Sequence, residues 1–110
     1  MPLFEKTRIE VYLPDLPAPA YRRLLDTFEQ EFTYTFGGCT IIHGLSGSYL
    51  SLLGFSIPDR VNLLYTDAPF ALSDAAALLS RYTDELREAA FQALEEESIL
   101  VVAWPVYHSG

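Results

Sequence analysis

The side chains best suited to acid–base chemistry stand near the middle of the chain. His43 carries an imidazole, and Tyr49, Asp59 and Arg60 follow it within a glycine-punctuated stretch. If this stretch folds back on itself, these groups meet in an acid–base or carboxylate-binding site, because imidazole exchanges protons near pH 7 and guanidinium binds carboxylates bidentately. The simpler interpretation of His43 is a rim histidine without a role, and that of Arg60 is a pair with a nearby carboxylate.

Two further reactive groups have simpler interpretations. A nucleophilic thiol needs a base or a helix N-terminus to lower its pKa, whereas Cys39 follows Gly37-Gly38 and precedes an apolar run. We therefore interpret Cys39 as a buried structural residue. His108 lies two residues from the C-terminus, where chains usually fray. The histidine spacing matches no metal site, so we expect neither a metal nor a cofactor.

Composition limits the classes of partner. The 110 residues carry 7 Lys plus Arg against 15 Asp plus Glu, a net charge of -8. This balance disfavours nucleic acids and anionic membranes. No apolar run approaches the ~20 residues that cross a bilayer, the N-terminus lacks a signal-peptide pattern, and the single cysteine excludes an internal disulfide. We expect one cytoplasmic domain over residues 1–110.

Hydrophobic periodicity predicts the elements that must position these side chains. The apolar stripe after Pro19 has helical spacing and ends at Gly37-Gly38, and a second helix of about 23 residues begins near Ser73 or Asp74. The predicted strands cover residues 7–13, 39–43, 61–66 and 98–107. Pro105 interrupts the last strand, which argues for a sheet edge or a bulge.

The order β-α-β-β-α-β predicts a ferredoxin-like α+β sandwich. Right-handed crossovers place both helices on one face of an antiparallel sheet. Residues 44–60 are the hardest to place, because Gly44, Gly47 and Gly54 punctuate them. We interpret them as an elaborated hairpin between the second and third strands, or as a loop folded over the sheet.

The sheet face without helices is the main functional clue. Residues 99–104 are apolar on both alternating faces, so both faces should be covered. We expect Arg8, Glu10 and Tyr12 on the open face. The third strand should add Asn62, Leu64 and Thr66, and the last strand either Leu100, Val102 and Trp104 or Ile99, Val101 and Ala103.

An apolar face of this kind marks an interface, and two such sheets packed together form a symmetric homodimer. We also predict a ligand pocket between the open face and residues 44–60. Its predicted lining is Tyr12, His43, Tyr49, Arg60, Asn62 and Trp104.

Two family resemblances bear on these expectations. The segment 36–42, the glycine and aromatic residues of 44–49, and a strand-helix-strand tail resemble a group of small uncharacterised bacterial proteins. That resemblance implies a ferredoxin-like fold and carries no activity. The start Met1-Pro2-Leu3-Phe4 and the stretch 58–62 are similar to the tautomerase superfamily, which implies Pro2 as an N-terminal general base. A strand that begins at Thr7 would leave Pro2 on a flexible N-terminal segment, whereas in that family the first strand begins at the proline.

The preferred hypothesis is a self-associating protein that binds a small ligand or a protein partner and has no chemistry of its own. The alternative is a small enzyme. It would be either tautomerase-like, with Pro2 as the base, or a dimeric α+β barrel enzyme that uses His43 or Tyr49 on a hydrophobic substrate.

Overall fold

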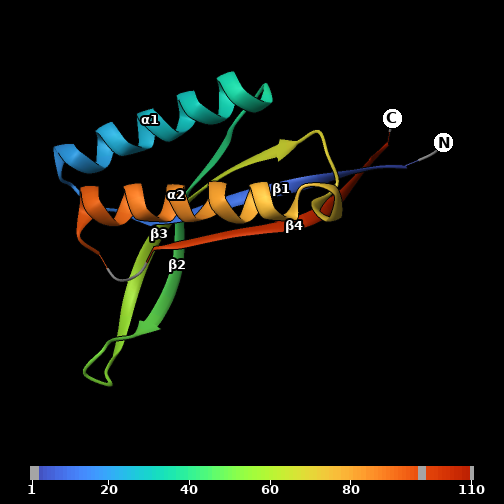
Figure 1. Cartoon of the computed structure of the whole chain (residues 1–110). Coiled ribbons are helices and arrows are strands. Elements are labelled where there is room, and N and C mark those ends of the chain that lie inside the picture. Colours follow the sequence, from blue (N-terminus) through green and yellow to red (C-terminus); the bar gives the residue numbers. More distant parts are fainter. Residues whose placement is uncertain (1–2, 97–98, 110) are drawn as a thin grey trace.

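The chain forms one four-stranded antiparallel sheet with two helices, in the predicted order (Figure 1). The computed structural model describes residues 3–96 and 99–109. The strands are β1 (Leu3–Pro14), β2 (Thr40–Leu50), β3 (Ser56–Ala68) and β4 (Leu100–Ser109), and the helices are α1 (Pro19–Phe36) and α2 (Ala76–Leu94). The sheet order is β2-β3-β1-β4. This is the ferredoxin-like arrangement that the sequence predicts.

The core lies between one sheet face and the two helices. Ile9, Val11 and Leu13 of β1 are fully buried there, which confirms the predicted inward face of that strand. The core residues contributed by the other elements are Leu64 and Ala68 from β3, Tyr21, Leu24, Phe28 and Phe32 from α1, and Leu79, Leu86 and Ala90 from α2. Their burial ties the helices to this face by the hydrophobic effect.

Both ends of α1 lie where the sequence predicts them, whereas α2 begins later than predicted. Pro19 stands in the first turn of α1, and Gly37 ends the helix at φ 94°, with its N–H donating to the Thr33 carbonyl. This is the expected glycine C-cap. The second helix is shorter than predicted, at 19 residues, because Ser73 and Asp74 form a separate 3-10 turn, η1 (Leu72–Asp74).

Residues 44–60 extend the sheet and do not fold over it. β2 and β3 remain paired from Ser46↔Arg60 to Leu50↔Ser56, beyond the last β1–β3 pair at Pro14↔Val61. The result is a two-stranded ribbon that projects from the body (Figure 1). At its tip the Ser51 N–H donates to the Phe55 carbonyl. The hairpin alternative is therefore confirmed.

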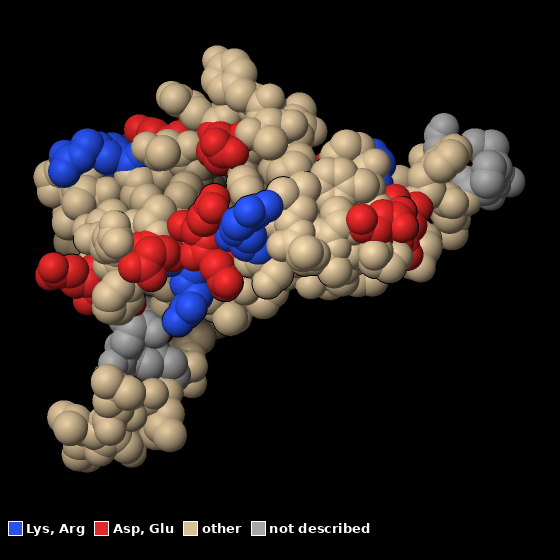
Figure 2. All heavy atoms as spheres, viewed as in Figure 1, with Lys and Arg blue, Asp and Glu red and all other residues tan. Residues whose placement is uncertain are grey.

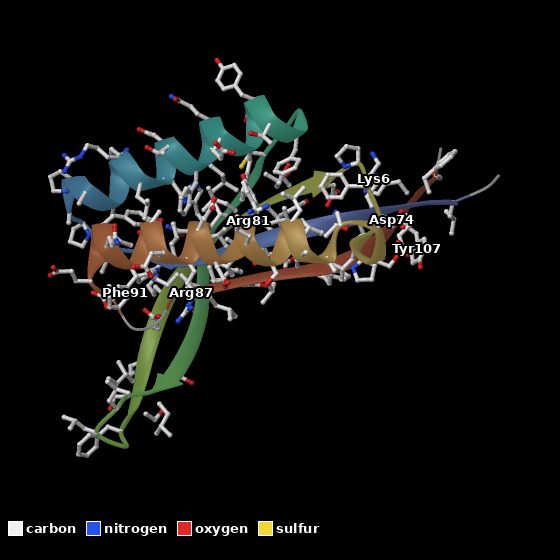
Figure 3. The ribbon with its side chains drawn as sticks, viewed as in Figure 1. Lys6, Asp74, Arg81, Arg87, Phe91 and Tyr107 are labelled. Atoms are coloured by element: carbon white, nitrogen blue, oxygen red, sulfur yellow. The ribbon has the colours of Figure 1, made fainter. Side chains whose placement is uncertain are left out.

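The ribbon tip is apolar and uncharged, whereas the outer surface of α2 is charged. Leu52 is 92% exposed and Leu53 84% exposed. No Asp, Glu, Lys or Arg occurs from residue 44 to residue 58. Figure 2 shows the projecting tip without charge. On α2, by contrast, Arg81 and Arg87 lie among acidic neighbours (Figures 2 and 3).

The last strand lies at a sheet edge. β4 pairs with β1 only, and Pro105 stands opposite Thr7 in that ladder. Because an edge strand has an unpaired side, proline is tolerated there, and the edge prediction is confirmed. Lys6 and Tyr107 lie toward the end of the sheet at which both chain ends emerge (Figure 3). Across the described ranges, no helix is long and apolar enough to span a membrane.

Candidate functional site

The open sheet face carries aromatic and aliphatic side chains around one ion pair. Strand register places the following residues on it: Lys6, Arg8, Glu10 and Tyr12 of β1, Leu63, Tyr65 and Asp67 of β3, Leu100, Val102 and Trp104 of β4, and Ile42 of β2. Trp104 is 44% exposed. The chain itself thus leaves a large apolar surface uncovered, as the sequence predicts.

The Arg8 and Asp67 charges on this face form an ion pair within the chain. Arg8 donates two hydrogen bonds to Asp67, from Nε at 2.8 Å and from Nη2 at 3.0 Å. Its guanidinium lies 4.3 Å from the Tyr65 ring centroid and 5.9 Å from that of Trp104. The hydrogen bonds and charge of Arg8 hold the pKa of Asp67 below its ordinary value, and those from His108 add to the shift. This pairing reduces the desolvation cost of covering the face.

Tyr12 and Trp104 are the two predicted site residues that do lie on the open face. The Tyr12 hydroxyl donates to Glu10 Oε1 at 3.1 Å. Partial burial and the Glu10 carboxylate raise the pKa of Tyr12, so the phenol keeps its proton at neutral pH. Of the two faces considered for the last strand, the structure selects Leu100, Val102 and Trp104, because these residues stand opposite Tyr12, Glu10 and Arg8.

Asn62 corrects the prediction for the third strand. Asn62, Leu64 and Thr66 face the helices and are buried, whereas Leu63 and Tyr65 occupy the open face. Two of the three buried residues, Asn62 and Thr66, are polar, so polar–apolar alternation gives the opposite phase to the one observed. The buried amide is tolerated because its groups are bonded inside the chain.

The Asn62 amide holds three other segments together. Its Oδ1 accepts the Gly44 N–H at 2.9 Å, and its Nδ2 donates to Asp15 Oδ1 at 3.3 Å and to the Tyr21 hydroxyl oxygen. Burial raises the pKa of Tyr21, partly opposed by the Asn62 hydrogen bond. We call this set of four residues the Asn62 clamp.

A cavity of about 190 Å³ adjoins the Asn62 clamp. Its lining comes from the β1–α1 connection at residues 15–18, from Tyr21, Arg22 and Leu25 of α1, and from His43 and Asn62 of the sheet. The cavity brings together two predicted site residues, but on the helix side of the sheet. The predicted single pocket between the open face and residues 44–60 is therefore wrong.

The remaining predicted residues lie near the root of the ribbon. Arg60 is exposed, and its Nη2 lies 3.4 Å from the position that a Cβ on Gly44 would take. The β2 register shift between Ile42 and Leu45 contains His43, which is exposed. The side chain of Tyr49 lies outside the described part of the structure, as does Pro2. The predicted proximity of Tyr49 to His43 and Arg60 therefore stays a prediction.

Cys39 lines a different cavity of about 380 Å³, together with Gly37, Gly38 and Asp67 among others. Burial, and secondarily the Glu29 charge, raise the pKa of Cys39 to about 11. The thiol is therefore protonated at neutral pH. Among residues 3–96 and 99–109, no cluster of three or more His, Cys, Asp or Glu is placed to hold a metal ion.

The raised pKa of Cys39 predicts that its thiol is alkylated slowly at neutral pH. Because only the thiolate reacts, alkylation of Cys39 by iodoacetamide at pH 7.5 should be roughly a hundredfold slower than that of an exposed cysteine of pKa near 8.5. The rate should keep rising up to about pH 11. Mass spectrometry of timed samples checks this, with free cysteine as the control. A plateau below pH 9 would contradict it.

Sequence reasoning misses the partners that organise both surfaces. It places Arg8 on the open face, but it does not predict the pairing with Asp67 across β1 and β3. It does not single out Tyr21 or Asp15. The contact between Asp15 and Asn62 follows only from strand register, which places Asn62 opposite Leu13, close to the end of β1.

Comparisons with known proteins identify similar folds. No family model and no curated protein matches the sequence. CutA1 from Oryza sativa matches with a TM-score of 0.58 and 19% identity, over 98% of this chain and 85% of that one. The divalent cation tolerance protein Cut A1 from Thermus thermophilus has a TM-score of 0.57 and 16% identity, over 97% and 88% of the two chains.

A third similar structure is CPII from Thiomonas intermedia, a nitrogen regulatory PII-like protein bound to ADP, AMP and bicarbonate. Its TM-score is 0.55 and its identity 17%, over 99% of this chain and 100% of that one. These comparisons do not support the tautomerase or the Gly-Gly-x-Thr resemblance. At this level of identity the chain shares the ferredoxin-like α+β fold of CutA1 and PII-like proteins.

Proposed function

We propose that this chain is a self-associating protein without chemistry of its own, and that a second copy covers its open sheet face. The observation that carries the proposal is the apolar composition of that face, where Ile42, Leu100 and Trp104 remain exposed in the single chain. The opposite face is already covered by α1 and α2. Patches of this kind usually mark interfaces.

The pairing of charges supports burial of the face. Arg8 is bound bidentately to Asp67, and Glu10 accepts the Tyr12 hydroxyl. A paired charge costs less to desolvate than an isolated one. Two copies related by a twofold axis can place Trp104 of each at a shared interface. This homodimer is the geometry that we propose.

The solution mass tests the proposal. Light scattering at micromolar concentration should give the mass of two 12.4 kDa chains. A mass of three chains would support self-association but would indicate a three-membered ring in place of the twofold dimer. A single-chain mass at all concentrations up to the millimolar range would contradict the proposal.

A matched pair of lysine variants locates the interface. Val102→Lys places a charge at a half-buried position of β4 on the open face, and Ala77→Lys adds the same charge to the exposed surface of α2. Val102→Lys should raise the dimer dissociation constant roughly a hundredfold or more, because an unpaired charge would be buried. Ala77→Lys should leave it unchanged. Equal behaviour of the two variants would exclude this face as the interface.

Binding of a small molecule is the second part of the proposed role. The PII-like neighbour is described with bound ADP, AMP and bicarbonate, so a chain with this fold can hold small ligands. Two of the enzyme alternatives depend on Pro2 and on the side chain of Tyr49, which lie outside the described residues. The cavity beside the Asn62 clamp is the better candidate for a ligand.

A further inference from the structure

The cavity beside the Asn62 clamp has the size of a small metabolite. Its volume of about 190 Å³ lies below the roughly 300–1,000 Å³ typical of sites for drug-sized ligands. It lies on the helix side of the sheet, away from Trp104 and the open face. An occupant of the cavity and a second copy on the open face are therefore independent.

The Asn62 clamp fixes two polar groups at the cavity wall. Each hydrogen-bonding end of the Asn62 amide already has a partner, so the amide orients its neighbours and is not free to bind a ligand. The Tyr21 oxygen accepts from Asn62, which leaves the Tyr21 O–H free to donate. Asp15 Oδ1 accepts a hydrogen bond from the Asn62 amide, and the second carboxylate oxygen, Oδ2, can accept one from a ligand.

The lining carries opposite charges on an apolar base. Asp15 supplies a carboxylate, while Arg22 supplies a guanidinium and His43 an imidazole. Leu16 and Leu25 also line the cavity and supply apolar surface. A ligand that satisfies this lining needs a cationic donor for Asp15, an anionic acceptor for Arg22 and a short apolar body.

We propose that this cavity binds a free α-amino acid with an apolar side chain. Its ammonium group contacts Asp15, its carboxylate accepts from Arg22 and from the Tyr21 O–H, and its side chain packs on Leu16 and Leu25. The Asn62 clamp preorganises Asp15 and Tyr21, which reduces the ordering cost of binding. A polyphosphate fits less well because Asp15 repels it.

Isothermal titration calorimetry with L-leucine tests the proposal. The wild-type chain should bind leucine, whereas 4-methylpentanoate, which lacks the ammonium, and 3-methylbutylamine, which lacks the carboxylate, should each bind at least tenfold more weakly. ADP should show no competition. Absence of heat with leucine, valine and phenylalanine, or binding of either analogue as tight as that of leucine, would overturn the proposal.

Two variants and a matched control identify the site. Asp15→Asn removes the charge but keeps an acceptor oxygen for Asn62, and Arg22→Gln removes the guanidinium. Each should weaken leucine binding roughly tenfold or more. Arg23→Gln, on the exposed side of α1 outside the lining, should leave it unchanged. Unchanged binding in both cavity variants would exclude this site.

A measurement on the wild-type chain covers the case in which a cavity variant fails to fold. In NMR spectra, leucine should shift the His43 ring and Tyr21 ring resonances and leave the Trp104 indole resonance unchanged. A shift of Trp104 without shifts of His43 and Tyr21 would place the ligand on the open face and overturn the proposal. The solution mass should be the same with and without leucine, so this test and the test of self-association can fail separately.

Discussion

Asn62→Leu is expected to lower the free energy of unfolding by about 2–3 kcal/mol, because it leaves hydrogen-bonding groups of the Asn62 clamp without a partner. Asn62 is 2% exposed. Leucine is similar in size, so packing is largely kept. The Gly44 N–H loses its acceptor at 2.9 Å, and the Tyr21 oxygen loses its donor.

Urea unfolding followed by circular dichroism measures this loss. Gln30→Leu is the matched control, since Gln30 is exposed on α1, and it should change stability by no more than about 0.5 kcal/mol. Combining Asn62→Leu with Tyr21→Phe should cost less than the sum of the single changes, because both remove the same hydrogen bond. If Asn62→Leu behaved like Gln30→Leu, the clamp would have no energetic role.

Asp67→Asn should destabilise the chain by about 1–3 kcal/mol at pH 7, because it removes the charge that receives two hydrogen bonds from Arg8 and one contact from His108 at 2.9 Å. The folded-state pKa of Asp67 is lowered from 3.8, chiefly by the Arg8 hydrogen bond. A lowered folded pKa stabilises the fold above the unfolded pKa, and this contribution is lost as pH falls through the folded pKa.

The deficit of Asp67→Asn should therefore be constant from pH 7 to about pH 5 and should disappear below the folded pKa of Asp67. Thermal unfolding across this pH range, at one fixed protein concentration, is the measurement, since association itself changes apparent stability. Asp26→Asn, on the exposed surface of α1, is the control. A deficit that persisted undiminished at pH 2 would show that Asp67 acts through packing and not through its charge.

The fold could be predicted because its elements have clear periodicity. The stripe from Tyr21 to Phe32 and the glycine at position 37 define α1, and strand-helix-strand order then leaves few topologies. Pro105 identifies an edge strand in the same way. The lengths of β2 and β3 could not be predicted, since their outer halves form a ribbon with no helix beside it and so show no one-sided burial.

The candidate site could be predicted only in part. His43 and Asn62 do share a cavity, but Asn62 faces the side opposite to the one expected. Asn62 and Thr66 are polar yet buried, so alternation indicates the wrong phase for β3, and a shift of one residue reverses every side chain. The polar contacts of Asp15 and Tyr21 depend on register between segments distant in sequence, which a single sequence does not contain.

The position of β1 at the centre of the sheet also has a consequence for how the chain is made. β1 leaves the ribosome before β2, β3 and β4, yet it pairs with β4, which follows the other three, from Leu3↔Ser109 to Tyr12↔Leu100. Pairings this distant in sequence raise the contact order and slow folding. During synthesis one edge of β1 stays without its strand partner until β4 emerges, and unpaired strand edges of this kind make a nascent chain prone to aggregate.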